Sequence, residues 1–204
     1  MSEQVNQKKN FKDTLNLPHT DFPIRANYKE EDVALLKRWE QEDLYKKTFN
    51  CNKNKQKFIL HDGPPYANGH LHCGHAYNKI LKDIVCKSQR MMGKHVPVTP
   101  GWDCHGLPIE FAVKKENPLL TGPALKKACR EYANKWINIQ KYEFKELGVL
   151  MDWDHPYLTM NFGYEASILQ AFSIFIDKGY IERKNKTVPW CPTCQTVLAS
   201  AEIE

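Results

Sequence analysis

One stretch, from Phe58 to His75, limits the possible folds of this 204-residue chain more than any other segment. Its first three residues are apolar, which suits a buried strand of a parallel sheet. Glycine, proline and asparagine then crowd the segment Gly63–Gly69, where neither helix nor sheet can continue. Beyond Gly74 the apolar residues recur at helical spacing, as in the pair Ile80 and Ile84. The stretch therefore predicts a strand, a glycine–proline loop and a helix.

Two histidines, His72 and His75, lie beside the predicted start of that helix. The first turn of a helix has unpaired backbone N–H groups and a partial positive charge, so it attracts anions such as phosphate. Side chains three residues apart share a face, so both imidazoles can donate hydrogen bonds to one phosphate. A His-x-x-His pair is also compatible with half a metal site or with two surface histidines. The loop matches neither the P-loop nor the Gly-x-Gly-x-x-Gly dinucleotide fingerprint.

The composition is that of a globular protein, with 42% hydrophobic and 26% charged residues, and it argues against wholesale disorder. A formal charge of +5 is compatible with nucleotide or RNA ligands without requiring them. The N-terminal residues do not resemble a signal peptide, and no apolar run is long enough to span a bilayer. Seven cysteines, of which only Cys191 and Cys194 are close in sequence, indicate a reducing cytosol rather than a disulfide framework. We therefore expect a cytoplasmic protein.

Helical periodicity predicts four main helices, over residues 28–47, 75–92, 123–147 and 162–178. The first should bury an apolar stripe that includes Val33 and Leu35. In the second, Lys79 and Lys82 should lie on or near the exposed side. The fourth is apolar along most of its length and should be well buried. A second strand is predicted at residues 95–98, which completes a strand–helix–strand unit of a parallel sheet.

Asp103 follows the second predicted strand. Ligands of open parallel sheets bind outside the carboxyl ends of the strands, so this carboxylate could hold the ammonium group of an amino acid. The same aspartate could instead cap a following helix. His105 could contact a ligand or brace the loop.

Two further clusters contain residues that can bind metals. Asp152, Asp154 and His155 suit either a metal or acid–base site or a turn with capping acids, and we prefer the turn. Cys191 and Cys194 have the spacing of a zinc knuckle, although two thiolates are half of a tetrahedral site. A thioredoxin-like redox pair is the alternative, but it belongs at a helix start in a βαβ context.

The loop and helix start resemble a known family. The residues Gly-Pro-Pro-Tyr-Ala-Asn-Gly at 63–69, followed by His-Cys-Gly-His at 72–75, are similar to the first signature of class I aminoacyl-tRNA synthetases, usually written His-Ile-Gly-His. The first of these segments resembles isoleucyl-tRNA synthetases rather than their valyl, leucyl or methionyl relatives. The segment 101–108 resembles the family's Gly-Trp-Asp-x-His-Gly-Leu-Pro, and the similarity extends from about Phe11 to Glu204.

This resemblance implies an α/β fold. Residues 51–185 would be the first half of a Rossmann-like, parallel-sheet catalytic domain, between an N-terminal arm and helix at 1–50 and the start of an editing insertion at 186–204. It implies that His72 and His75 are catalytic, and that Asp103 holds the amino group of the substrate. The implied ATP-binding residues are Pro65, Tyr66, Ala67, Asn68, Gly69, His72, Gly74 and His75, and the implied amino-acid-binding residues are Gly63, Pro64 and Asp103. Cys191 and Cys194 would supply half of a zinc site.

The implied activity is that of an isoleucine–tRNA ligase. With ATP and Mg2+ it would activate isoleucine as the aminoacyl-adenylate and transfer it to tRNA(Ile). We expect the chain to be an N-terminal piece of such an enzyme, which is inactive without the C-terminal remainder. Apart from that remainder we expect a monomer that does not bind a membrane. The remainder would also complete any Zn2+ site. The alternatives are a sister class I synthetase of the valyl or leucyl type, another nucleotidyltransferase with the same signature, or a non-catalytic nucleotide- or RNA-binding remnant.

Overall fold

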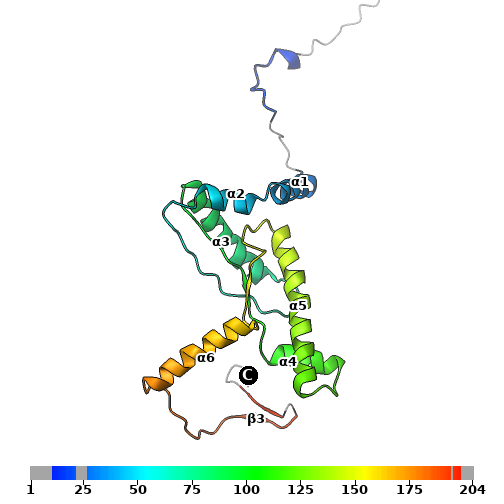
Figure 1. Cartoon of the computed structure of the whole chain (residues 1–204). Helices are drawn as coiled ribbons and strands as arrows, with labels where there is room; N and C mark the ends of the chain where they lie inside the picture. Colours follow the sequence, from blue (N-terminus) through cyan, green and yellow to red (C-terminus); the bar gives the residue numbers. More distant parts are fainter. Residues whose placement is uncertain (1–10, 22–26, 194, 199–204) are drawn as a thin grey trace, which may run out of the picture. The chain divides into compact units, whose positions relative to one another are not determined.

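The computed structural model describes residues 11–21, 27–193 and 195–198. The chain divides into two compact units, Met1–Leu44 and Tyr45–Glu204. Figure 1 follows the elements along the chain. The helices are η1 (Lys12–Thr14, a 3-10 helix), α1 (Tyr28–Gln41), α2 (Leu44–Cys51), α3 (Cys73–Met91), α4 (Leu107–Glu116), α5 (Gly122–Glu146) and α6 (Phe162–Asp177). The strands are β1 (Gly101–Trp102), β2 (Tyr157–Leu158), β3 (Trp190–Cys191) and β4 (Thr196–Val197).

The predicted helix over residues 28–47 is in fact two helices, α1 and α2. They are separated at Asp43, whose φ of 45° is left-handed and interrupts the helix. Aspartate is one of the few side chains that adopt this conformation at moderate cost. The predicted burial of the α1 stripe is also wrong: no residue of α1 is buried, and Val33 and Leu35 are exposed. Apolar periodicity identifies a face, but it does not supply the element that covers it.

Helix α3 agrees closely with the prediction in length, but its buried face is polar. Lys79, Asp83, Cys86 and Arg90 are its buried residues, whereas Ile84 is 57% exposed. The expectation that Lys79 lies near the exposed side is therefore wrong, and Lys82 is half-buried. Buried polar groups are tolerated when they are paired. Arg90, for example, donates to the carbonyl of Val96 (3.1 Å), and Asp83 accepts from the backbone N–H of Leu150 (2.9 Å).

Parallel pairing is present but short. The predicted strand at 58–60 is wrong as a continuous buried strand, because Ile59 is 70% exposed and the pairing is confined to two isolated bridges. Proline has no N–H to donate, so Pro64 and Pro65 cannot contribute donors to a ladder next to the second bridge. The predicted strand at 95–98 is likewise a single bridge followed by extended chain. The parallel partners are Lys57↔His95, Tyr66↔Asp103, Gly101↔Tyr157 and Trp102↔Leu158. The middle segment, 95–103, thus pairs on both sides, as expected for an α/β fold.

The core of the second unit is centred on Trp102 and helix α5. Trp102 is fully buried, and its ring lies 6.2 Å from that of Trp153, which in turn stacks on Phe144 at 6.2 Å. Helix α5 confirms the prediction over 123–147, and α4 packs against it. The residues that α5 buries are Ala133, Ile137, Gln140 and Phe144. Gln140 is a polar member of this face, and its partners are described below.

Helix α6 confirms the predicted position but not the predicted burial. It has no buried residue, and Leu169 is 68% exposed. Its first turn is attached to α5 by Arg130, which pairs with Glu165 (2.8 Å) and lies 4.8 Å from the ring centre of Phe162. Apolar composition indicates that a helix needs cover, and within the described residues α6 receives none that buries a side chain. None of the helices in the described ranges has the length and apolarity needed to cross a bilayer.

The structure tests one of the two clusters of possible metal-binding residues and describes only part of the other. Residues 152–155 form the predicted turn, in which Nδ1 of His155 lies 3.0 Å from a carboxylate oxygen of Asp152. Cys191 lies in an antiparallel hairpin of β3 and β4, whereas Cys194 lies outside the described residues. Throughout the described part of the chain, no three or more His, Cys, Asp or Glu side chains gather where they could hold a metal ion.

Candidate functional site

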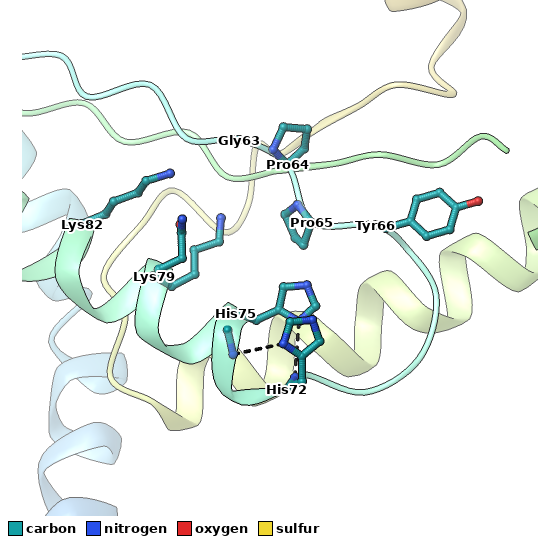
Figure 2. A pocket seen from close by; sticks show the side chains of 10 residues that line it. Gly63, Pro64, Pro65, Tyr66, His72, His75, Lys79 and Lys82 are labelled. Atoms are coloured by element: carbon teal, nitrogen blue, oxygen red, sulfur yellow. Dashed lines mark hydrogen bonds between the residues drawn. The ribbon is translucent and has the colours of Figure 1, made fainter. Parts of the chain in front are cut away.

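A pocket of about 430 Å3 lies between the glycine–proline loop and the start of α3 (Figure 2). Seven of the residues that line it were predicted as site residues: Gly63, Pro64, Pro65, Tyr66, His72, Gly74 and His75. Three others were not predicted: Asn78, Lys79 and Lys82. Four predicted residues, Ala67, Asn68, Gly69 and Asp103, do not line the pocket, and each is placed below.

The two histidines are stacked at the helix start. Their ring centres are 3.8 Å apart, and the planes are inclined by 29°. The backbone N–H of Gly74 donates to Nδ1 of His72 (3.0 Å), and the backbone N–H of His72 donates to Nδ1 of His75 (3.3 Å). Together they form a reciprocal capping box, in which imidazoles take the place of the usual hydroxyl and carboxylate groups. Figure 2 shows both rings at the pocket, with these hydrogen bonds dashed.

These bonds select one tautomer of each neutral ring. A backbone N–H can only donate, so each Nδ1 must be the unprotonated acceptor and each neutral ring carries its hydrogen on Nε2. Burial, followed by the neighbouring charge of His72, lowers the pKa of His75 and so favours its neutral form. The helix start therefore presents two Nε2–H donors with a defined tautomer.

Gly74 is required for this arrangement. A Cβ added at this position would lie 2.9 Å from Cε1 and 3.0 Å from Nδ1 of His72, closer than ordinary contact. The glycine of the predicted signature therefore leaves room for the first histidine ring to turn back onto the helix.

Ala67, Asn68 and Gly69 form the turn behind the pocket. Ala67 is fully buried, and Oδ1 of Asn68 accepts from the hydroxyl of Tyr132 (2.7 Å). Gly69 has a φ of +80°, a left-handed conformation that favours glycine. These residues fix the course of the loop, whereas its first residues and the histidines face the pocket.

Asp103 lies beside the loop through its backbone. Its N–H donates to the carbonyl of Pro65 (2.9 Å), and its own carbonyl accepts from Ala67 (2.8 Å). The alternative in which Asp103 caps a helix is not observed, since α4 begins after Gly106 and has no side-chain cap. His105 lies with Nε2 3.2 Å from the carbonyl oxygen of Thr159, a bracing contact of the kind that the sequence allowed.

A buried charge cluster was missed by the sequence analysis. Asp62, which directly precedes the loop, is ion-paired with Lys79 and, at 2.8 Å, with Lys82. Burial and then the charge of Lys82 lower the pKa of Lys79 to about 7, while the facing carboxylate opposes this fall. The two lysines outnumber the carboxylate, so the pocket wall is electropositive when both are charged. The available signal was spacing: His75, Lys79 and Lys82 follow one another at i, i+4 and i+7, which is one helical face.

The site thus combines donors and positive charge. Two oriented Nε2–H groups, a helix N-terminus and a pair of lysines surround one cavity, and such an arrangement suits a multiply charged anion such as a polyphosphate.

Comparisons with known proteins agree on one family. Residues 34–204 match the family described as tRNA synthetases class I (I, L, M and V). The chain is 54% identical to the isoleucine–tRNA ligase of Desulfotalea psychrophila over 199 residues, which are 95% of this chain and 21% of that protein. It is 48% identical to the isoleucine–tRNA ligase of Mannheimia succiniciproducens over an alignment of 208 residues, which covers 100% of this chain and 22% of that protein.

A solved structure is also similar. It is the LeuRS of Agrobacterium radiobacter, described as a ternary complex with tRNA and LeuAMS. The TM-score is 0.67 and the identity 28%, over 86% of this chain and 21% of that chain. This similarity supports the Rossmann-like fold of the class I enzymes. The chain spans about a fifth of the length of the curated relatives that it matches.

Proposed function

Because the chain belongs to the class I tRNA synthetases of the I, L, M and V group, we propose that its pocket is the ATP-binding part of an isoleucine–tRNA ligase. Such an enzyme joins the carboxylate of isoleucine to the α-phosphorus of ATP. One carboxylate oxygen forms the new bond to phosphorus, and the bond from phosphorus to the pyrophosphate oxygen breaks. The aminoacyl group then passes from the adenylate to a ribose hydroxyl of tRNA(Ile).

The observation that carries this proposal is the backbone-fixed tautomer of His72 and His75. Negative charge develops on the phosphate oxygens in the transition state, and donors that are already oriented stabilise that charge without reorganising. The two Nε2–H groups are such donors, because their Nδ1 atoms are held by the helix N-terminus. Lys79 and Lys82 add positive charge along the same wall.

Other residues take supporting roles in the proposal. Pro65 and Tyr66, with Gly74, would contact the nucleotide, and Ala67 to Gly69 would hold the turn from behind. Gly63 and Pro64 would line the side-chain pocket of isoleucine. Asp103 would hold the ammonium group. Its backbone is hydrogen-bonded to the loop, and its Oδ1 lies 3.4 Å from the hydroxyl of Thr159.

The wider assignments are part of the same proposal. In this proposal the domains are 1–50, 51–185 and 186–204, and the protein acts in the cytoplasm. Mg2+ would enter with ATP as part of the substrate. Cys191 and Cys194 would supply half of a zinc site, which the C-terminal remainder of such an enzyme would complete.

A chimera tests the proposal most sharply. The 199 matched residues of the Desulfotalea psychrophila ligase are replaced by this chain, and amino-acid-dependent ATP–pyrophosphate exchange is measured. We expect exchange with isoleucine, and negligible exchange from this chain alone. A folded chimera that uses leucine or methionine instead would assign the chain to a sister enzyme. A folded chimera without any exchange would reject the proposal.

The histidine role has its own test. In the chimera, His75→Ala should lower kcat for exchange by about 100- to 1,000-fold, the range for loss of one oriented donor. The matched control is His155→Ala, which removes an exposed histidine that pairs with Asp152 outside the pocket. Equal rates in the two variants would remove His75 from the chemistry.

A further inference from the structure

Four side chains on one face of helix α5 contact the turn behind the pocket or the residues directly after that turn. Its side chains at 132, 136, 140 and 143 are spaced by four, four and three positions, so they lie on one side of the helix. Their partners lie about 70 residues earlier in the chain. The contacts are Tyr132 to Asn68, Trp136 to His70, Gln140 to Tyr66 and Gly69, and Glu143 to His70 and Leu71.

Gln140 is the centre of this face. It is fully buried, and each of its polar atoms has a partner. Its Nε2 donates to the carbonyl oxygens of Tyr66 (3.0 Å) and Gly69 (2.8 Å), and its Oε1 accepts from Nε1 of Trp102 (3.0 Å). The indole can only donate and the two carbonyls can only accept, so the orientation of the amide is determined.

These contacts join the two ends of the turn. Tyr66 lines the pocket, and Gly69 is the left-handed residue three positions later, just before the histidine segment. One amide nitrogen therefore holds both ends at a fixed separation. A carboxylate of the same shape could not do this, because its oxygen would face two carbonyl oxygens.

Glu143 makes similar contacts to the residues directly before the histidines. Its Oε2 accepts from the backbone N–H of Leu71 (3.0 Å), and its Oε1 lies 2.5 Å from Nδ1 of His70. Burial opposes ionisation of Glu143, but the hydrogen bonds from His70 and Leu71 lower its pKa overall. The residue directly before His72 is thus fixed by the same helix.

We propose that Gln140 is a positioning residue for ATP: its amide closes the Tyr66–Gly69 turn and so sets where the loop and the His72 helix start lie around the nucleotide. This inference rests on the proposed function for the identity of the ligand. In this proposal, helix α5 controls the shape of the pocket although none of its residues lines the pocket.

The test uses two substitutions and one control. Gln140→Met keeps the volume and removes all three hydrogen bonds, and Gln140→Glu keeps the shape and removes the double donor. Asn138→Asp is the matched control, since it makes the same amide-to-carboxylate change two residues away at an exposed position of α5.

The first measurement is amide hydrogen exchange on the chain itself. The N–H of Ala67, bonded to Asp103, and that of Leu71 should exchange about 5- to 30-fold faster in both Gln140 variants, the factor that one or two ordinary hydrogen bonds contribute. The amides of α3 beyond its first turn should keep their rates, and Asn138→Asp should change nothing. Unchanged exchange at Ala67, or equally faster exchange throughout the second unit, would overturn the inference.

The second measurement is kinetic and uses the chimera. Both Gln140 variants should raise KM for ATP by about 5- to 30-fold, with a smaller effect on KM for isoleucine. The defect of Gln140→Glu should grow as pH rises, because a buried carboxyl that ionises loses its remaining donor. An active chimera in which Gln140→Met has a normal KM for ATP would refute the positioning role. If the unsubstituted chimera is inactive, the proposed function fails, and hydrogen exchange on the chain still decides whether Gln140 holds the turn.

Discussion

Replacing Gly74 by alanine should separate the stability of α3 from the geometry of its histidines. The added Cβ would lie 2.9 Å from Cε1 of His72, so the ring must withdraw by about 0.6 Å to reach ordinary contact. The hydrogen bond from Gly74 N–H, now 3.0 Å, would then lengthen to about 3.6 Å and be lost. The movement is cheap in itself, because a side-chain ring can turn, but it removes the cap.

Two effects of similar size then oppose each other. Loss of an N-cap costs about 1 kcal/mol, whereas alanine in place of glycine stabilises a helix by about 0.5–1 kcal/mol. The free energy of unfolding should therefore change little. Gly163→Ala is the matched control, because Gly163 is likewise the second residue of its helix, α6, and nothing lies within 4 Å of its added Cβ. That variant should be more stable than Gly74→Ala by about 1 kcal/mol, measured by urea unfolding.

The two variants should differ most in ATP binding. Displacement of His72 removes one donor to a charged ligand, worth about 1.5–3 kcal/mol, so ATP affinity should fall by about 10- to 150-fold. Nitrogen-15 NMR of the imidazoles would show directly whether His72 still carries its hydrogen on Nε2. If Gly74→Ala gains as much stability as Gly163→Ala and keeps its ATP affinity and tautomer, the role assigned to this glycine is refuted.

Two further predictions follow from charge and exposure. The pKa of Lys79 in the folded chain is lowered to about 7 from its ordinary value of 10.5. Between these limits the unfolded chain therefore binds more protons, and stability should rise with pH. In Lys79→Met this rise should be smaller in urea unfolding curves measured from pH 7 to 10, and an unchanged slope would contradict the shift. Leu169→Glu, on the 68% exposed side chain of α6, should cost less than about 0.5 kcal/mol, whereas Phe144→Ala, which is 1% exposed, should cost about 3–5 kcal/mol. Comparable losses of stability would mean that α6 is covered.

The sequence predicted the backbone course of the site loop and the following helix more accurately than the contacts around them. The glycines and prolines of 63–69 act locally, as does the helix that starts at the histidines, and both lie where local conformational rules place them. The long helix over 123–147 could be predicted equally well, because its apolar periodicity extends over many turns. These features depend on neighbours in the chain.

The errors arise where a distant partner decides the outcome. Lys79 was expected near the exposed side because a charge is normally solvated, and its burial depends on Asp62, seventeen residues earlier. Gln140 was not recognised for the same reason, since nothing near it in sequence indicates Tyr66 and Gly69 as partners. The exposed α6 is the converse case, in which apolar composition predicted a cover that the described residues do not provide.

The contacts between α5 and the turn before the histidines have a consequence for synthesis on the ribosome. The nascent chain emerges from its N-terminus, so the segment with His72 is released well before the helix residues 132–143 that fix the preceding turn. Contacts over so long a separation form late in folding, because a large loop must first be closed. The histidine segment should consequently remain without its final conformation, and without affinity for nucleotide, until translation has passed well beyond Glu143.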